Sequence, residues 1–174
     1  MQACEQTKGL SILAHGEQVH QKFLDLIQGR TEGWRLPKWL QCSFFMDRLL
    51  PLDTTSWYHV YHDCGKPFCR TVGEDGKVHF PDHASVSAGI WRVHGGDPII
   101  ADLIQHDMDM HLMRPSDVQT YARKDLAPTL LLTALAEIHA NAEMFGGIES
   151  TSFKIKFKNL ERLGCAFYKE LSNV

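Results

Sequence analysis

Apolar residues recur along most of this chain every three or four positions, the spacing of one face of an α-helix. Between residues 10 and 27 this face holds Ile12, Val19 and Phe23, and Gly29 follows as a stop signal. The same reasoning predicts further helices at 38–50, 54–63, 82–94, 97–106, 116–122, 126–145 and 152–171. The alternation of apolar and basic residues at 153–157 also fits a strand, so the start of the last helix stays open.

The segment 65–81 does not follow the helical pattern, because it is rich in glycine and proline. Its Glu74-Asp75-Gly76 run is a turn signal, which predicts a small hairpin within 69–80. The sequence therefore predicts an all-α fold, a compact bundle of about six to eight helices with at most one small hairpin. A length of 174 residues favours a single domain, with a core at about 10–147 and a C-terminal helix at about 152–171.

The composition of the chain argues against several classes of function. A net charge of −3 gives no basic field, so we expect no stable DNA binding and no attachment to an anionic membrane. No apolar run approaches the ~20 residues that a membrane span needs, and the first residues do not read as a signal peptide. The five cysteines are scattered and lack the CxxC spacing, which indicates reduced thiols and a cytoplasmic protein.

Histidines carry the main chemical signal. An adjacent pair, His62-Asp63, ends a predicted helix, while His15 lies upstream and His83 and His106 lie downstream. Taken alone, His15 is interpreted as a buried core residue, His83 as a surface residue, and His62 and His106 as helix-end residues. Together, imidazole and carboxylate groups in this order predict a site for a divalent metal ion.

The run YHDCGKP at 61–67 resembles the His-Asp-x-Gly-Lys signature of the HD-domain metal-dependent phosphohydrolase superfamily. The segments HFPDHASVSA at 79–88, LIQH at 103–106 and LLLTALAE at 130–137 resemble later segments in the HD domain of bacterial CCA-adding tRNA nucleotidyltransferases. The likeness runs from about 15 to about 147, and it covers only the phosphohydrolase portion of those enzymes. It implies an all-helical HD-type domain around one or two metal ions.

The resemblance also implies a ligand set. His15, His62 and Asp63 would bind a first ion, and Asp63 would bridge to a second ion held by His83 and His106. The last ligand of the family is normally Asp, whereas the matching position here is Glu137. Asp107 and Asp109 stay open as competitors for this last position.

Two residues are predicted to serve catalysis directly. Asp63 would hold the metal, and Lys66 would place a positive charge on a phosphate oxygen; alone, Lys66 reads equally well as a solvated lysine at a helix end. The expected ion is Mn, Mg, Co, Ni, Zn or Fe. The leading hypothesis is a phosphohydrolase, a phosphatase or phosphodiesterase, in which metal-activated water attacks a phosphomonoester or a 2′,3′-cyclic phosphate.

The expected partner is a small phosphorylated substrate, a nucleotide or an RNA end. The oligomeric state stays open, a dimer included. One alternative is an HD-type diiron oxygenase that uses the same ligands. Another is a catalytically degenerate HD domain that binds a nucleotide without turnover, which the Glu at position 137 keeps open.

Overall fold

The prediction of an all-α fold is confirmed. The computed structural model describes residues 1–7, 9–41 and 43–172, and these are mostly helical (63%) with two small two-stranded sheets. None of the helices formed by these residues is both long enough and apolar enough to cross a membrane.

The described chain divides into two compact units. The first unit comprises residues 1–20 and 52–107, and the second comprises residues 21–51 and 108–174. One helix, α1 (Ile12–Ile27), contributes residues to both units.

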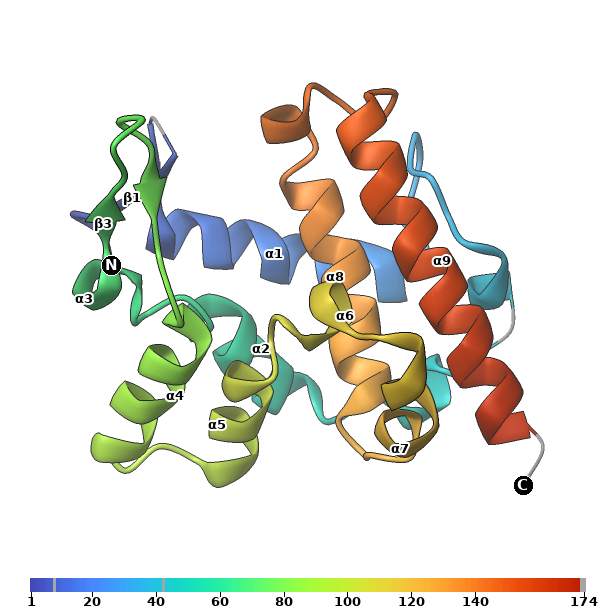
Figure 1. Ribbon diagram of the computed structural model, residues 1–174. Coiled ribbons are helices and arrows are strands. Elements are labelled where there is room, and N and C mark those ends of the chain that lie inside the picture. Colours follow the sequence, from blue (N-terminus) through green and yellow to red (C-terminus); the bar gives the residue numbers. More distant parts are fainter. Residues whose placement is uncertain (8, 42, 173–174) are drawn as a thin grey trace. The chain divides into compact units, whose positions relative to one another are not determined.

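The first unit contains the predicted His-Asp signature. Besides the start of α1 it holds β1 (Glu5–Thr7), β2 (Leu10–Ser11), α2 (Leu52–Tyr61), α3 (Lys66–Cys69), β3 (Thr71–Val72), β4 (Val78–His79), α4 (His83–Val93) and α5 (Pro98–Gln105). Helix α5 packs against α2 and α4, and α3 packs against α4 (Figure 1). As predicted, Asp97 caps α5: its Oδ1 accepts the Ile99 N–H at 2.7 Å, with Pro98 as the first helical residue.

Two hairpins lie in the first unit, one more than predicted. The predicted one pairs Thr71 with His79 and Val72 with Val78. The unpredicted one pairs β1 with β2, and Ile12 N–H also bonds to the Cys4 carbonyl at 2.9 Å. These strands have two or three residues each, too few to show an alternation of apolar and polar positions.

The second unit is built on two long helices. It holds η1 (Lys38–Gln41), η2 (Met46–Arg48), α6 (Asp109–Leu112), η3 (Pro115–Asp117), α7 (Val118–Ala122), α8 (Ala127–Ala140), η4 (Glu143–Phe145) and α9 (Thr151–Ser172). Helices α8 and α9 pack side by side (Figure 1). Residues 153–157 are helical, since they form part of α9.

Two predicted helix bounds are wrong in this unit. The segment 38–50 forms two short 3₁₀ turns instead of one helix. Trp39 and Phe45 are both buried, with ring centroids 5.2 Å apart. On one α-helix, six positions would place them ~240° apart around the axis, so burying both rings together requires a break. Helix α8 ends at Ala140 rather than near residue 145.

Candidate metal centre

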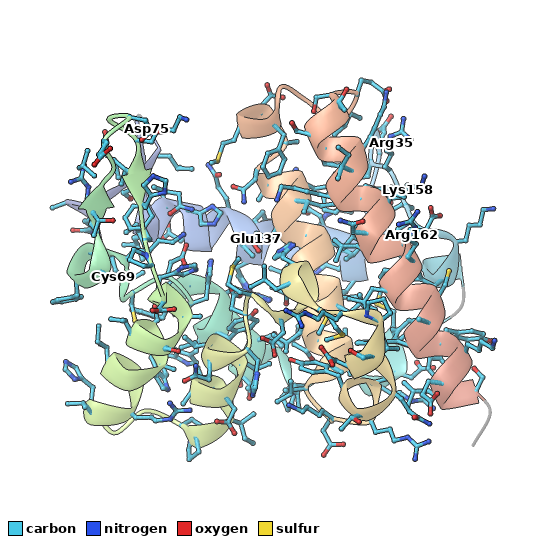
Figure 2. The ribbon with its side chains drawn as sticks, in the orientation of Figure 1. Arg35, Cys69, Asp75, Glu137, Lys158 and Arg162 are labelled. Carbon is cyan, nitrogen blue, oxygen red and sulfur yellow. The ribbon has the colours of Figure 1, made fainter. Side chains whose placement is uncertain are left out.

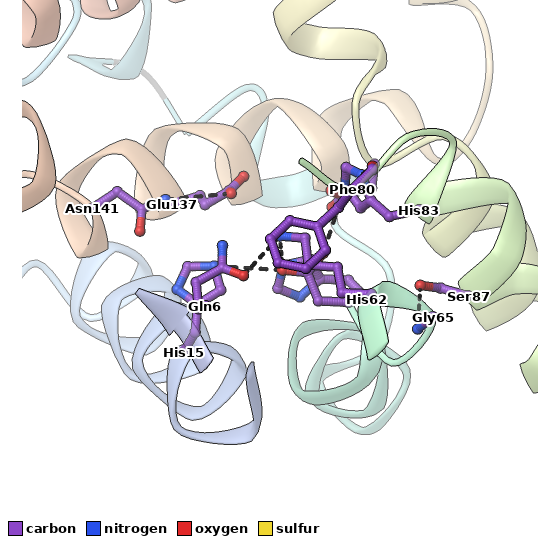
Figure 3. Close-up of polar contacts among 12 residues, drawn as sticks. Gln6, His15, His62, Gly65, Phe80, His83, Ser87, Glu137 and Asn141 are labelled. Carbon is purple, nitrogen blue, oxygen red and sulfur yellow. Dashed lines mark hydrogen bonds and ion pairs between the residues drawn. The ribbon is translucent and has the colours of Figure 1, made fainter. Parts of the chain in front are cut away.

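Three of the predicted ligands come together in the first unit. Potential ligand atoms of His15, His62 and Asp63 all lie within 4.8 Å of one another. These side chains are almost fully buried, at 0%, 3% and 1% exposure. Figure 3 labels two of them, His15 and His62. Burying an ionisable carboxylate is costly unless charges or hydrogen bonds compensate it. Charges and hydrogen bonds from the neighbours of Asp63 offset this cost.

The two oxygens of Asp63 face different neighbours. Oδ2 lies 2.5 Å from Lys66 Nζ, 3.2 Å from His62 Nε2 and 3.9 Å from His15 Nε2. Oδ1 lies 3.5 Å from His83 Nε2, is buried and accepts no hydrogen bond. One oxygen thus faces the predicted first ion's ligands, and the other faces a ligand predicted for a second ion.

Asp63 is held in its ionised form. Burial raises the pKa of its carboxyl group, but the charges of His62 and Lys66 and the hydrogen bonds they donate outweigh this effect. The net result is a pKa well below the usual range of an aspartate. The carboxylate is therefore available as an anionic ligand at neutral pH.

Hydrogen bonds to backbone carbonyls orient two imidazole rings towards this carboxylate. His62 Nδ1 lies 2.7 Å from the carbonyl oxygen of His59, and His83 Nδ1 lies 3.0 Å from that of Phe80. Because a carbonyl only accepts hydrogen bonds, each Nδ1 carries a proton, and Nε2 is the ring nitrogen that faces the carboxylate. This arrangement is typical of histidine ligands of metals.

Lys66 is part of the same buried network. Its Nζ donates to Asp63 Oδ2 and, at 2.9 Å, to Gln6 Oε1, and the residue is only 7% exposed. Gln6 was not predicted: it lies on β1, in a segment without a recognisable motif. The solvated lysine that the sequence also allowed is not what the structure shows.

Close contacts between backbone segments hold the ligands in place. Gly16, beside His15 in α1, lies against the end of α2, where an added Cβ would be 2.5 Å from the Val60 carbonyl oxygen. Gly65, beyond Asp63, donates its N–H to Ser87 Oγ at 2.8 Å, and an added Cβ would be 2.5 Å from the Ser87 nitrogen. Helix α2 ends at Tyr61, so His62 and Asp63 leave the helical spiral and both reach the cluster.

The other predicted ligands are not members of this three-residue group. His106 lies half-buried at the C-terminal end of α5. Asp107 accepts a hydrogen bond from the Tyr58 hydroxyl at 2.6 Å through its Oδ1. Asp109 begins α6 in the second unit.

Glu137 lies on α8 in the second unit (Figure 2). There its Oε2 is 3.3 Å from His111 Nε2, and its Oε1 accepts a long hydrogen bond of 3.5 Å from the Asn141 amide. Its assignment as the last ligand stays a prediction.

The cysteines take no part in the three-residue group. Cys4, Cys64, Cys69 and Cys165 are free thiols, as predicted, and Cys42 lies outside the described residues. Burial raises the pKa of the Cys64 thiol, whose Sγ contacts the Ser87 carbonyl at 3.6 Å. Cys64 therefore behaves as a packing residue of the His-Asp-x-Gly-Lys segment.

Comparison of the chain with protein-family models, with curated proteins and with solved structures found no match. Functional inference therefore rests on the site itself.

Proposed function

We propose that this protein is a metal-dependent phosphohydrolase that acts on a nucleotide or an RNA-end phosphate. The observation that carries the proposal is the buried His15/His62/Asp63 group with the Lys66 ammonium against the same carboxylate. Apolar residues would fill a purely structural role at a lower cost in free energy, because burying several polar groups together destabilises the fold.

The donor set fits a divalent ion. Two imidazoles and a carboxylate suit Zn, Mn, Fe, Co or Ni. Asp63 Oδ1 is a buried oxygen that accepts no hydrogen bond, and coordination to a metal ion would satisfy it. His83 on the Oδ1 side supports the predicted bridging role of Asp63 towards a second ion, for which His106 and Glu137 are the further predicted ligands.

The chain's own residues have distinct tasks in this proposal. An ion held by His15, His62 and Asp63 would lower the pKa of a water molecule and polarise a phosphoryl oxygen. Lys66 would neutralise charge that develops on the phosphoryl group. The oxygen of water bonds to phosphorus while the bond from phosphorus to the leaving alcohol breaks. The proton lost by water ends on that alcohol, so no nucleophilic serine or cysteine is needed.

The test begins with metal content. The purified protein is stripped with chelator, reloaded separately with Mn, Mg, Co, Ni, Zn or Fe, and screened against phosphomonoesters, 2′,3′-cyclic phosphates and nucleotides. We expect activity that is lost on stripping and restored by one or more ions. Iron-dependent oxygen consumption without phosphate release would favour the oxygenase instead, and nucleotide binding without turnover would favour the degenerate domain.

A further inference from the structure

The first unit contains a cavity of about 720 Å³ next to the candidate metal centre. Its lining comes from the N-terminal segment and from residues around α3 and β4: Met1, Ala3, Cys4, Glu5, Gln6, Pro67, Arg70 and Val78. This volume falls within the ~300–1,000 Å³ typical of ligand pockets.

Gln6 connects this cavity to the centre. It lines the cavity, and its Oε1 accepts the hydrogen bond from Lys66 Nζ at 2.9 Å. Lys66 in turn contacts the Asp63 carboxylate at 2.5 Å. Gln6 therefore lies between the cavity and Lys66, and this one amide side chain separates a molecule in the cavity from the Lys66 ammonium.

Arg70 brings a positive charge into the cavity lining, and no ion pair with a described carboxylate holds it in place. Some other arginines of the chain form ion pairs, such as Arg92 with Asp102 at 3.1 Å and Arg123 with Glu170 at 2.8 Å. Within the described residues, no carboxylate forms an ion pair with Arg70. Glu5, which also lines the cavity, instead accepts a hydrogen bond from the Gly9 N–H at 3.2 Å.

The spacing of the two cations is informative. Lys66 begins α3 and Arg70 follows its last residue, so they lie about one helical turn apart. Within a helix, Cβ atoms at this spacing lie ~5–6 Å apart, and Arg70 continues from the last residue of α3 in extended backbone. A guanidinium group suits a phosphate diester or monoester because it donates two parallel hydrogen bonds. Two cations one turn apart, one of them beside the centre, match two phosphates separated by one nucleoside.

We propose that this cavity receives the terminal nucleoside of an oligonucleotide and that Arg70 binds the next phosphate along the strand. The inference rests on the proposed function and deepens it: the substrate is an oligonucleotide end, and a mononucleotide is a poorer substrate. In this proposal the reacting terminal phosphate extends from the cavity past Gln6 to Lys66 and the His15/His62/Asp63 group.

The experiment compares two probes on the full chain, uridine 3′-monophosphate and the dinucleotide UpUp, which carries a terminal 3′-phosphate and one internal phosphate. Variants are Arg70→Ala, Arg70→Lys and the matched control Arg92→Ala. Equilibrium binding is measured without metal by calorimetry, and KM and kcat are measured with the best ion. We expect Arg70→Ala to weaken UpUp about tenfold in Kd or KM, the loss of one charge-assisted contact. Arg70→Lys recovers part of the affinity, while uridine 3′-monophosphate and Arg92→Ala change little.

The outcomes separate the two proposals. Arg70-dependent binding of UpUp without phosphate release under any metal supports the cavity's role and contradicts the phosphohydrolase. Hydrolysis in which Arg70→Ala equals the wild type for UpUp, or weakens both probes equally, overturns the oligonucleotide site and leaves the phosphohydrolase intact. If neither probe binds nor is hydrolysed, both proposals fail.

Discussion

Each unit buries histidine, but in opposite surroundings. In the first unit, His62 lies 3.2 Å from an ionised carboxylate that also contacts the ammonium of Lys66. In the second unit, His139 lies between two aromatic rings, stacked on Trp34 at 4.2 Å and edge-on to Phe153 at 5.0 Å. Its Nε2 donates to the Arg35 carbonyl at 3.1 Å.

The contrast shows that burial alone does not mark a functional histidine. Burial lowers the pKa of His139 to about 4, so this ring is neutral and serves packing. A ligand histidine needs more: a nearby anion and a hydrogen bond that fixes its other nitrogen. His62 has both, and the predictions below test whether this difference has chemical consequences.

The largest expected effect comes from Asp63→Ala, which removes the carboxylate at the heart of the first cluster. We expect loss of bound metal and of all metal-dependent turnover, because no other described side chain bridges the same neighbours. Metal content by elemental analysis and phosphate release are the measurements. His94→Ala, at an exposed position after α4, is the control. Unchanged metal content in Asp63→Ala would refute the site.

Lys66→Met should separate metal binding from catalysis. The ammonium contacts the same carboxylate oxygen as the His62 imidazole, so its removal should leave metal affinity equal or higher. Loss of its charge next to the reacting phosphate should lower kcat by ~10²–10³. Lys77→Met, which alters an exposed lysine paired with Asp75, is the matched control. A Lys66→Met protein with wild-type kcat would leave Lys66 a structural role only.

His139 should make stability depend on pH. Its pKa is about 4 in the folded chain and close to 6.5 when unfolded. Above pH 6.5 neither state is protonated; as the pH falls towards 4, the unfolded state takes up the proton first. The free energy of unfolding should fall by up to roughly 3 kcal/mol across this window. Urea unfolding of the wild type and of His139→Gln checks this, because the variant lacks the titration. His94→Gln serves as control, and an equal pH slope in His139→Gln would contradict the assignment.

Glu137→Gln tests the prediction that Glu137 is the last metal ligand. We expect metal affinity to fall by ~10–100-fold, the range for changes in a metal's surroundings. Asp107→Asn and Asp109→Asn should do less, and Asp107 already accepts the Tyr58 hydrogen bond. Metal titration by calorimetry decides. If the Asp107→Asn protein loses its metal while the Glu137→Gln protein keeps it, the assignment of the last ligand is wrong. The assignment of His15, His62 and Asp63 would still stand.

The sequence predicted the helical class from local spacing, and its resemblance to the HD-domain signature grouped His15 with His62 and Asp63. Helical spacing placed His15 on the apolar face of α1, and the His-Asp-x-Gly-Lys run placed His62 and Asp63 at the end of α2. What it missed depends on contacts between distant segments. Gln6 reaches Lys66 from sixty residues away, and no local spacing reveals such a bond. The paired burial of Trp39 and Phe45 likewise overrode the helical pattern of their segment.

Gly16 has a consequence for how this site could change over evolutionary time. A methyl group at this position would collide with main-chain atoms of α2, which no choice of rotamer can relieve. His15 and His62 are therefore tied to each other through the backbone rather than through replaceable side chains. Sequence drift elsewhere in α1 can alter surface charge freely. A change at Gly16 would shift the register between the two ligand-bearing segments, and the first cluster would tolerate it only through a coordinated change in α2.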